Sequence, residues 1–414
     1  MHRMSMLRRG RWNLAGMFFL SMALPAQTVT TIYNFGSQGH DGVNPKSHVI
    51  VGPQGQLYGT TAGGGELNYG TVYELMPPVS AGGVWTEVVL HSFNGPDGQD
   101  PCSAPLLGPN GALYGVTRSS TSEYQAMAFE LDPPTDASTH WSYRVIHQFP
   151  FVTGRAYPSG ALAFGTGQSL YGVTLNTVYS LTPPSPSGGA WTETTLFTFP
   201  SGHYDSYALG TLAVSGNGTL FGANAALGSG RCIEGCGLVF SLTPPGAVSA
   251  SWTYRVLHEF GAQAGDGLNP SAGVILTPTG VLYGTTENGG AGSMGTVFAL
   301  TPGGLPGAPM TETILHAFSG SDGGNPEPGV LAGPNGVLYG STPSGGANGH
   351  GTVYVLIPPT AAGGSWTETV LYNFTGGADG STPVGLALGS DGTLYGTTNV
   401  GGTFNEGTVF TIKF

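Results

Sequence analysis

LYGTT at residues 57–61 is the first of seven closely similar pentapeptides in this chain of 414 residues. The later copies read LYGVT at 113–117 and 170–174, LFGAN at 220–224, LYGTT at 282–286 and 394–398, and LYGST at 338–342. Their spacing of 50 to 62 residues is too regular for chance and too long for a coiled-coil or collagen repeat. Each copy therefore marks one structural unit.

The sixth unit shows what one repeat contains. GVLAGPNGVLYGSTPSG at 329–345 has the pattern of two short strands joined by a Gly-Pro-Asn-Gly turn. GTVYVLIPP at 351–359 predicts a third strand, ended by two prolines that cannot donate to a ladder. SWTETVLYNF at 365–374 is rich in β-branched and aromatic residues and predicts a fourth. We name these strands a, b, c and d.

Four short antiparallel strands, repeated about every 56 residues without helices, predict the blades of a β-propeller. A solenoid would have shorter coils, and a single sandwich would not repeat its sequence seven times. We expect an all-β, seven-bladed propeller of four-stranded blades, forming a single domain over residues 27–414. The d-to-a and b-to-c loops should share one face, and the a-to-b turns and Pro-rich c-to-d loops the other.

The two ends of the chain predict how the ring closes. The last unit stops at strand c, EGTVFTIKF at 406–414, and lacks a strand d after it. QTVTTIYNF at 27–35 aligns position for position with WTETVLYNF at 366–374. We therefore expect the N-terminal strand to pair with the last strand c, which completes the seventh blade and covers two open sheet edges.

Residues 1–26 have the order of a secretory signal peptide: arginines, an apolar stretch over 14–24, and the small residue Ala26. The apolar run is too short to span a bilayer, so we expect an exported chain without a membrane span. Arg8 and Arg9 leave the Sec and twin-arginine routes open. Cleavage after Ala26 leaves seven Lys and Arg against 23 Asp and Glu, a formal charge of −16 that argues against nucleic acid as a partner.

The repeat signature L-Y-G-x-T, then G-G, then G-T-V-[FY]-x-L, resembles that of the GloVer tandem-repeat family, the choice-of-anchor repeat proteins. The resemblance covers nearly all of the mature chain, and the second and third units depart from it between strands b and c. It implies an exported, cell-surface or secreted protein, in a family whose members differ in their C-terminal anchors. Because this chain stops at Phe414 without a sorting motif or hydrophobic tail, we expect no C-terminal anchor.

The sequence predicts different states for the three cysteines. Cys232 and Cys236 lie in one loop, RCIEGCG at 231–237, and could close a small disulfide after export. Zinc would need four ligands, and no second pair or nearby His completes the set. Cys102 is left as a buried or free thiol.

Aromatic and imidazole side chains recur at two positions of strand d, and we interpret them as packing residues rather than as a reactive site. One position of this strand holds His91, His147, His258, His316, Tyr33, Phe197 and Tyr372. Because strand d is the outermost strand of a blade, it holds these side chains far apart, and a metal site shared between the histidines is not expected. A tryptophan begins strand d in five units, namely Trp85, Trp141, Trp191, Trp252 and Trp366. We interpret it as blade-edge packing rather than as a sugar-stacking surface.

Asp-Gly steps mark most d-to-a loops. Their aspartates are Asp41, Asp97, Asp100, Asp266, Asp322 and Asp379. The carboxylates could rim the channel mouth and attract Ca²⁺, the one cofactor that the sequence suggests. Asp-Gly followed by Pro is also good turn chemistry, and the turn interpretation is favoured because each loop lacks a dense cluster of oxygen ligands.

Two d-to-a loops lose this pattern and form the candidate binding site. They read VTGRAYPSG at 152–160 and SGHYDSYALG at 201–210, beside the enlarged b-to-c loop that holds Cys232. The candidate ligand-binding residues are Arg155, Tyr157, His203, Tyr204, Asp205 and Arg231. This mixture could bind a polar ligand or perform acid-base chemistry, and neutral repeat decay is the third alternative.

No nucleophile elbow, zinc-protease motif or phosphate-binding loop occurs, so no catalytic residue is assigned. We expect a secreted, monomeric binding or structural module at the cell envelope, with a polysaccharide or a surface protein as its ligand. The alternative is a propeller-fold polysaccharide lyase or hydrolase. Binding predicts a contiguous pocket, catalysis predicts two ionisable groups within reach of one point, and a passive spacer predicts neither.

Overall fold

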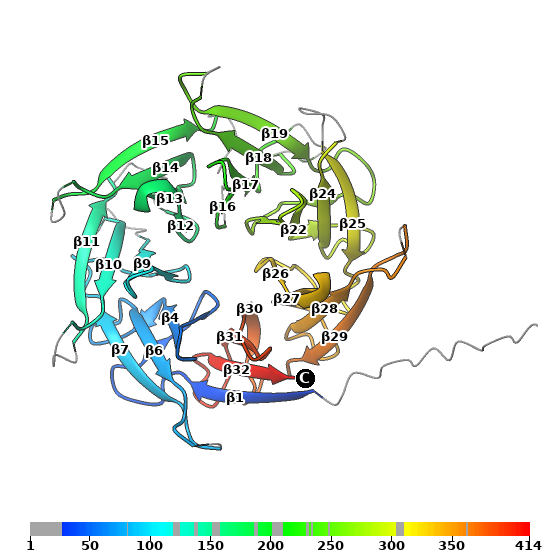
Figure 1. The fold of residues 1–414 in the computed structure, drawn as a ribbon. Coiled ribbons are helices and arrows are strands. Elements are labelled where there is room, and N and C mark those ends of the chain that lie inside the picture. The colour runs from blue at the N-terminus through cyan, green and yellow to red at the C-terminus, as the bar shows by residue number, and fades with distance from the viewer. Residues whose placement is uncertain are drawn as a thin grey trace, which may run out of the picture.

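The computed structural model describes residues 27–80, 82–118, 125–135, 140–150, 158–185, 189–200, 210–228, 232, 235–246, 249–303, 310–361 and 363–414. Over these residues seven four-stranded antiparallel sheets stand around a common centre (Figure 1). The predicted all-β, seven-bladed propeller is confirmed. Two 3-10 turns, η1 (Thr166–Gln168) and η2 (Pro334–Gly336), interrupt a-to-b connections. No helix in the described part of the chain has the length and apolar character needed to cross a membrane.

Each blade runs from an inner strand a to an outer strand d. The first three blades are β3 (Ile50–Val51), β4 (Leu57–Thr61), β6 (Thr71–Met76) and β7 (Thr86–Ser92); β8 (Leu106–Leu107), β9 (Leu113–Val116), β10 (Met127–Asp132) and β11 (Ser142–Gln148); and β12 (Ala163–Phe164), β13 (Leu170–Val173), β14 (Thr177–Thr182) and β15 (Thr192–Thr198). The next three are β16 (Ala213–Val214), β17 (Leu220–Asn224), β18 (Leu238–Thr243) and β19 (Thr253–Glu259); β21 (Ile275–Leu276), β22 (Leu282–Thr286), β24 (Thr296–Thr301) and β25 (Thr311–Ala317); and β26 (Val330–Ala332), β27 (Leu338–Thr342), β28 (Thr352–Ile357) and β29 (Thr367–Asn373).

The seventh blade is built from both ends of the chain. It contains β30 (Ser381–Leu388), β31 (Leu394–Val400), β32 (Thr408–Lys413) and the N-terminal strand β1 (Thr28–Asn34). β1 pairs antiparallel with β32, with Thr28 opposite Lys413 and Asn34 opposite Thr408. The blue and red strands therefore lie side by side in Figure 1. The predicted closure of the ring by the N-terminal strand is confirmed.

The glycine of each LYGxT pentapeptide makes room for an aromatic ring of strand c. Gly59 of β4 lies directly across the ladder from Tyr73 of β6, and Gly284 of β22 lies across from Phe298 of β24. A Cβ atom on Gly59 would stand 2.3 Å from the Tyr73 hydroxyl oxygen, and one on Gly284 would stand 2.5 Å from the Phe298 ring. The same glycine-aromatic pair recurs in all seven blades. The recurring glycine therefore lets a buried ring lie flat against strand b.

The final threonine of the pentapeptide explains the G-T-V step in strand c. Thr61 and Thr71 share a hydroxyl hydrogen bond of 2.7 Å, and Thr286 and Thr296 share one of 2.8 Å. The fourth unit has Asn224 at this position, and its Oδ1 accepts hydrogen bonds from the backbone N–H groups of Ala226 and Leu227 instead. Each side chain thus satisfies polar groups where strands b and c separate.

Buried rings at the end of strand d join each blade to the next. Phe260, which ends strand d of the fourth blade, packs edge to face on Phe298 of the fifth at a centroid distance of 5.0 Å. The other interfaces hold Phe93–Phe129, Phe149–Tyr179, Phe199–Phe240, Phe318–Tyr354, Phe374–Phe410 and Phe35–Tyr73. Phe35 follows β1, so the N-terminal strand supplies the seventh contact. The core is therefore a closed circle of inter-blade ring contacts.

The tryptophans that precede strand d pack against the tyrosine of the preceding blade's pentapeptide. Trp141 lies 5.9 Å from Tyr58 between ring centroids, and Trp366 lies 6.0 Å from Tyr283. Trp85 makes the same contact with Tyr395 across the closing blade. These contacts confirm the interpretation of the tryptophans as blade-edge packing.

Two loop types meet on one face, as expected. β2 (Gly42–Val43), in a d-to-a loop, pairs with β5 (Gly63–Gly64), in a b-to-c loop. β20 (Gly267–Leu268) and β23 (Asn288–Gly289) repeat this pairing in the fifth unit. The d-to-a segments then continue into the innermost strands, so this face leads to the centre of the ring.

Candidate functional site

A cavity of about 520 Å³ lies at the centre of the ring. Its lining comes from the segment before or within strand a of each of the seven blades. Arg118, which follows strand b of the second blade, and residues 339–341 of strand b in the sixth blade complete it. The lining includes the runs 46–48, 102–104, 159–161, 210–211, 271–275 and 327–331, together with Val384 and Leu386. Because about half of the lining residues are glycine, alanine or serine, the lining offers backbone groups and hydroxyls to a ligand.

Several polar atoms in this lining have no hydrogen-bond partner among the described residues. They are the hydroxyl oxygens of Ser103, Ser271 and Ser341 and the Nε of Arg118. Buried polar groups are normally paired with protein, water or ligand. The lining as a whole, with its hydroxyl-bearing residues and one guanidinium, has the composition of a site for a polar, hydroxyl-rich ligand.

Charges of both signs stand at the cavity. Lys46 pairs with Asp100 at 3.3 Å, and both side chains are exposed. The Arg118 guanidinium donates to the Ser159 carbonyl at 3.5 Å and is not paired with a carboxylate of the described residues. Burial, reinforced by Glu287, raises the pKa of Glu327. The cavity therefore has no strong excess of one charge.

Cys102 and His48 are the titratable lining groups that could react. Burial raises the pKa of Cys102 to about 11, so its thiol is protonated at neutral pH and is a poor nucleophile. Burial lowers the pKa of His48, which keeps its imidazole neutral and able both to donate and to accept a hydrogen bond. These properties suit binding better than nucleophilic catalysis.

The ligand-binding residues predicted from the sequence lie outside the described residues. These are Arg155, Tyr157, His203, Tyr204, Asp205 and Arg231. The first five precede Ser159 and Gly210 in the chain, and both of these line the cavity. Cys232 and Cys236 form a disulfide, with Cα atoms 5.2 Å apart, and Cys236 is fully buried. The signal segment 1–26 is also outside the described part.

The Asp-Gly carboxylates turn to the rim of the ring. Asp97 Oδ1 accepts from the Asn94 N–H at 2.8 Å, and Asp322 Oδ1 accepts from the Ser319 N–H at 2.9 Å. The Asp379 carboxylate likewise accepts from the Thr375 N–H. The favoured turn interpretation therefore holds for these loops. The alternative, in which such carboxylates rim the channel mouth, does not describe Asp97, Asp322 and Asp379, because their second contacts are with the rings of strand d.

A β-bulge aims those rings at the next blade. Where β19 pairs with β18, Leu257 is the extra residue between Val256 and His258, and the same register shift occurs in all seven outer pairs. A bulge bends the strand and redirects the side chain that follows it. The ring can then meet two groups: the aspartate of its own d-to-a loop, where that loop keeps one, and the residue two positions after the start of the next blade's strand d.

The partner in the next blade decides what each ring does. Where that residue is Glu, the ring approaches a carboxylate: His147 lies 2.9 Å from Glu193, and His258 lies 3.4 Å from Glu312. Where it is Tyr, the rings stack, as in the pairs His91–Tyr143 at 3.8 Å and Phe197–Tyr254 at 4.2 Å. The histidines do not gather into one site, as expected.

The sequence analysis missed these glutamates. Glu87, Glu193, Glu312 and Glu368 all stand two residues after the position that starts strand d, which was a visible signal. Burial and the neighbouring aspartate raise the pKa of Glu312 to about 8 and that of Glu368 to about 7. Burial also lowers the pKa of His258. These shifts follow from placing carboxylates together between blades.

Comparison with solved structures shows the same fold in proteins of low sequence identity. A catalytically inactive variant of virginiamycin B lyase from Staphylococcus aureus, solved with quinupristin, matches with a TM-score of 0.57 at 12% identity, over 94% of this chain and 99% of that one. PorZ, a bacterial surface component of the type-IX secretion system of Porphyromonas gingivalis, matches with a TM-score of 0.51 at 14% identity, over 89% of this chain and 46% of that one. At these identities the likeness shows the fold alone.

Comparison with sequence families identifies the repeat. No curated protein matches the chain. The profile described as the Gloeobacter/Verrucomicrobia repeat matches residues 5–178 and 305–414, which is more than half of the chain. This is the GloVer repeat that the LYGxT signature resembles, and the chain belongs to the Gloeobacter/Verrucomicrobia repeat family.

Proposed function

We propose that this protein is an exported binding module that takes a polar ligand, such as the end of a glycan chain, into the central cavity from the d-to-a face. The single observation that carries the proposal is the central cavity, whose lining brings Ser103, Ser271 and Arg118 together from different blades. Hydroxyl and guanidinium side chains and the backbone of the lining are the kinds of donor and acceptor that a hydroxyl-rich ligand needs. A cavity of about 520 Å³ has room for one or two sugar rings, within the usual range of ligand sites.

Export is part of the same proposal. The basic and apolar order of residues 1–26 supports a cleaved signal, and the disulfide between Cys232 and Cys236 suits an oxidising compartment. The low content of charged residues, 8%, suits a surface that contacts neutral polysaccharide. We place the protein at the cell envelope or outside it, as a monomer, with a polysaccharide or a surface protein as its partner.

Glycan-array screening of the mature chain, with and without chelator, tests the proposal. Arg118→Ala should weaken binding at least tenfold, as expected for a lost hydrogen bond to a charged donor of roughly 1.5–3 kcal/mol. Arg255→Ala, on the outer strand β19, is the matched control and should bind as the wild type. Equal binding by the Arg118 and Arg255 variants would exclude the central cavity as the site.

The loop residues predicted from the sequence need their own variant. A triple change, Arg155→Ala with Tyr157→Ala and His203→Ala, removes candidate side chains that precede two cavity-lining segments in the sequence. Retained binding in this variant would remove the two irregular loops from the site while leaving the cavity itself in place. Incubating any bound glycan with the protein and measuring chain ends tests the alternative of a lyase or hydrolase, and new chain ends would favour that alternative over pure binding.

A further inference from the structure

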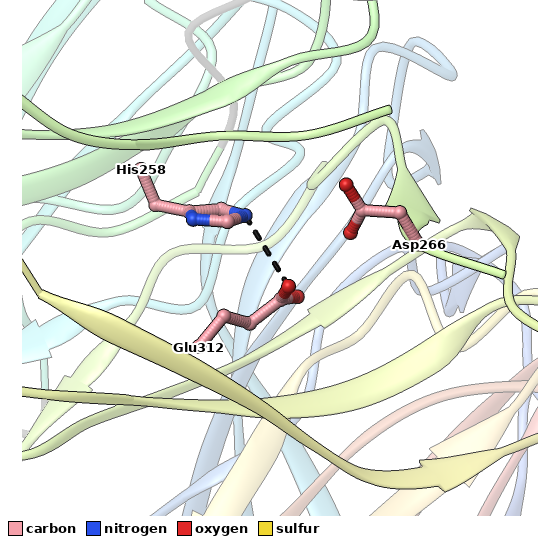
Figure 2. Close-up of side chains that lie close together, drawn as sticks. All are labelled: His258, Asp266 and Glu312. Atoms are coloured by element: carbon pink, nitrogen blue, oxygen red, sulfur yellow. Dashed lines mark ion pairs between the residues drawn. The ribbon is translucent and has the colours of Figure 1, made fainter. Parts of the chain in front are cut away.

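The interface between the fourth and fifth blades holds three convergent ligand atoms of the kind that Zn²⁺ prefers. His258 lies in β19, Asp266 follows that strand, and Glu312 lies in β25 of the next blade. One ligand atom from each lies within 4.8 Å of the other two. Figure 2 shows the three side chains pointing toward a common space. Imidazole and carboxylate are both ordinary zinc ligands.

Each of the three groups keeps one buried atom without a hydrogen-bond partner, although His258 and Glu312 form an ion pair at 3.4 Å. His258 Nε2, Asp266 Oδ1 and Glu312 Oε1 are buried and have no hydrogen-bond partner among the described residues. Asp266 is only 9% exposed, and its other oxygen, Oδ2, accepts from the Ala262 N–H at 3.1 Å. That bond holds the carboxylate through Oδ2 and leaves Oδ1 without a partner. An unpaired buried carboxylate is costly unless a proton or a cation neutralises it.

The same position in another blade shows how the cluster is satisfied by a side chain. There Tyr33 replaces the histidine, and its hydroxyl lies 3.0 Å from Asp41 Oδ2 and 3.1 Å from Glu87 Oε2. The Ser37 hydroxyl also donates to Asp41 Oδ2, at 3.2 Å. The hydroxyl of Tyr33 therefore occupies the space between the two carboxylates. His258 is shorter than Tyr33, and its Nε2 remains 3.4 Å from Glu312 Oε2.

A second His-Asp-Glu cluster is closed in a different way. His316 Nε2 hydrogen-bonds Asp322 Oδ2 at 3.0 Å, and the Ser319 N–H and hydroxyl group donate to Asp322 Oδ1. The histidine and the aspartate are thus already paired, and Glu368 lies beside them. Only the cluster at His258 has an unpartnered atom on all three ligands, among the residues that the structure describes.

The geometry points to a Zn²⁺ site formed by His258, Asp266 and Glu312, which ties the fourth blade to the fifth at the rim of the ring. Two ligands of a tetrahedral zinc ion with bonds of about 2.0–2.2 Å stand about 3.4 Å apart. The distance from His258 Nε2 to Glu312 Oε2 is 3.4 Å. This matches the separation of two zinc ligands and is longer than a typical hydrogen bond. Water completes the fourth position, and the ion neutralises both carboxylates.

Zinc binding is tested on the mature chain after removal of metal with EDTA. Titration with Zn²⁺, followed by dialysis and metal analysis, should give one ion per chain that is lost on His258→Phe. Phenylalanine is the matched replacement, because Phe197 occupies this position in the third blade and packs there on Tyr254. His316→Phe is the control and should keep the ion at His258.

The coordination itself has a separate readout. Co²⁺ added in place of Zn²⁺ should give the visible absorption of a tetrahedral site in the wild type and in the His316 control, and lose it in Glu312→Gln. Zn²⁺ should also raise the thermal midpoint of the wild type and leave that of His258→Phe unchanged, because only the form that binds metal is stabilised.

The result that would overturn the site is equal zinc content in the wild type and a folded His258→Phe. Binding of Ca²⁺ as tight as that of Zn²⁺ would also overturn it, because an imidazole ligand favours Zn²⁺. Two ions per chain, one of them lost in each histidine variant, would support this site and extend it to His316. Circular dichroism of each variant separates lost binding from lost folding.

Discussion

Removal of the N-terminal strand tests the closure of the ring. A chain starting at residue 36 lacks β1, so β32 loses its six paired positions in the sheet. It also loses Phe35, which is fully buried, and Tyr33, which is 8% exposed. Burial of two such rings contributes ~3–6 kcal/mol, and the partly buried Val29 and Ile32 add about 1 kcal/mol each. The total of about 5–8 kcal/mol is comparable with the whole stability of a typical domain, ~5–15 kcal/mol.

The assay compares chemical denaturation of chains that begin at residues 27 and 36. The shorter chain should unfold at a much lower denaturant concentration, or aggregate through the exposed edge of β32. A permuted chain gives the matched control: residues 27–35 are moved behind Phe414 through a loop copied from 77–85, which joins strands c and d in the first blade. This chain has the strand order of the other blades and should recover the stability of the wild type.

A graded variant separates the strand from its side chain. Phe35→Ala should cost about 3–5 kcal/mol, the usual loss for a buried ring, and Phe374→Ala in the sixth blade should cost the same. Both rings are fully buried and pack edge to face on the next blade at 5.2 and 5.1 Å. If the chain starting at residue 36 melted like the wild type, or if Phe35→Ala were neutral while Phe374→Ala was costly, the reasoning on closure would be refuted.

Two further predictions concern the repeat and the rim. Gly284→Ala places a Cβ atom 2.5 Å from the Phe298 ring and should lower the free energy of unfolding, measured by urea denaturation, by about 1–3 kcal/mol. Gly216→Ala is the control, because a Cβ atom there meets no atom within 4 Å. Equal effects of the two substitutions would contradict the role of the glycine. Burial and Asp41 raise the pKa of Glu87 to about 9, so the folded chain holds a proton that the unfolded chain releases near pH 4.5. Stability should therefore fall as pH rises from about 4.5 to 9, and Glu87→Gln should flatten this part of a melting curve series; an unchanged slope would disprove the assignment.

The sequence determined the architecture because the repeat encodes local pairing. The LYGxT glycine, the aromatic residue of G-T-V-[FY] and the two threonines all meet across one pair of neighbouring strands, such as β4 and β6. Seven copies of such a unit, with strand d displaced to residues 27–35, leave little choice but a closed ring. The tryptophans were also interpretable, since their packing partner is the tyrosine of the same pentapeptide in the preceding blade.

The tertiary structure alone decided which side chains of different blades meet. His258 and Glu312 are far apart in sequence, and neither is unusual by itself, but the bulge at Leu257 turns the imidazole toward the fifth blade. The cavity forms in the same way, because Ser103, Arg118 and Ser271 converge only through the curvature of the ring. A repeat can be recognised from the sequence alone because its contacts are local. The sites form between repeats, where small register shifts and the angle between blades set the distances between side chains.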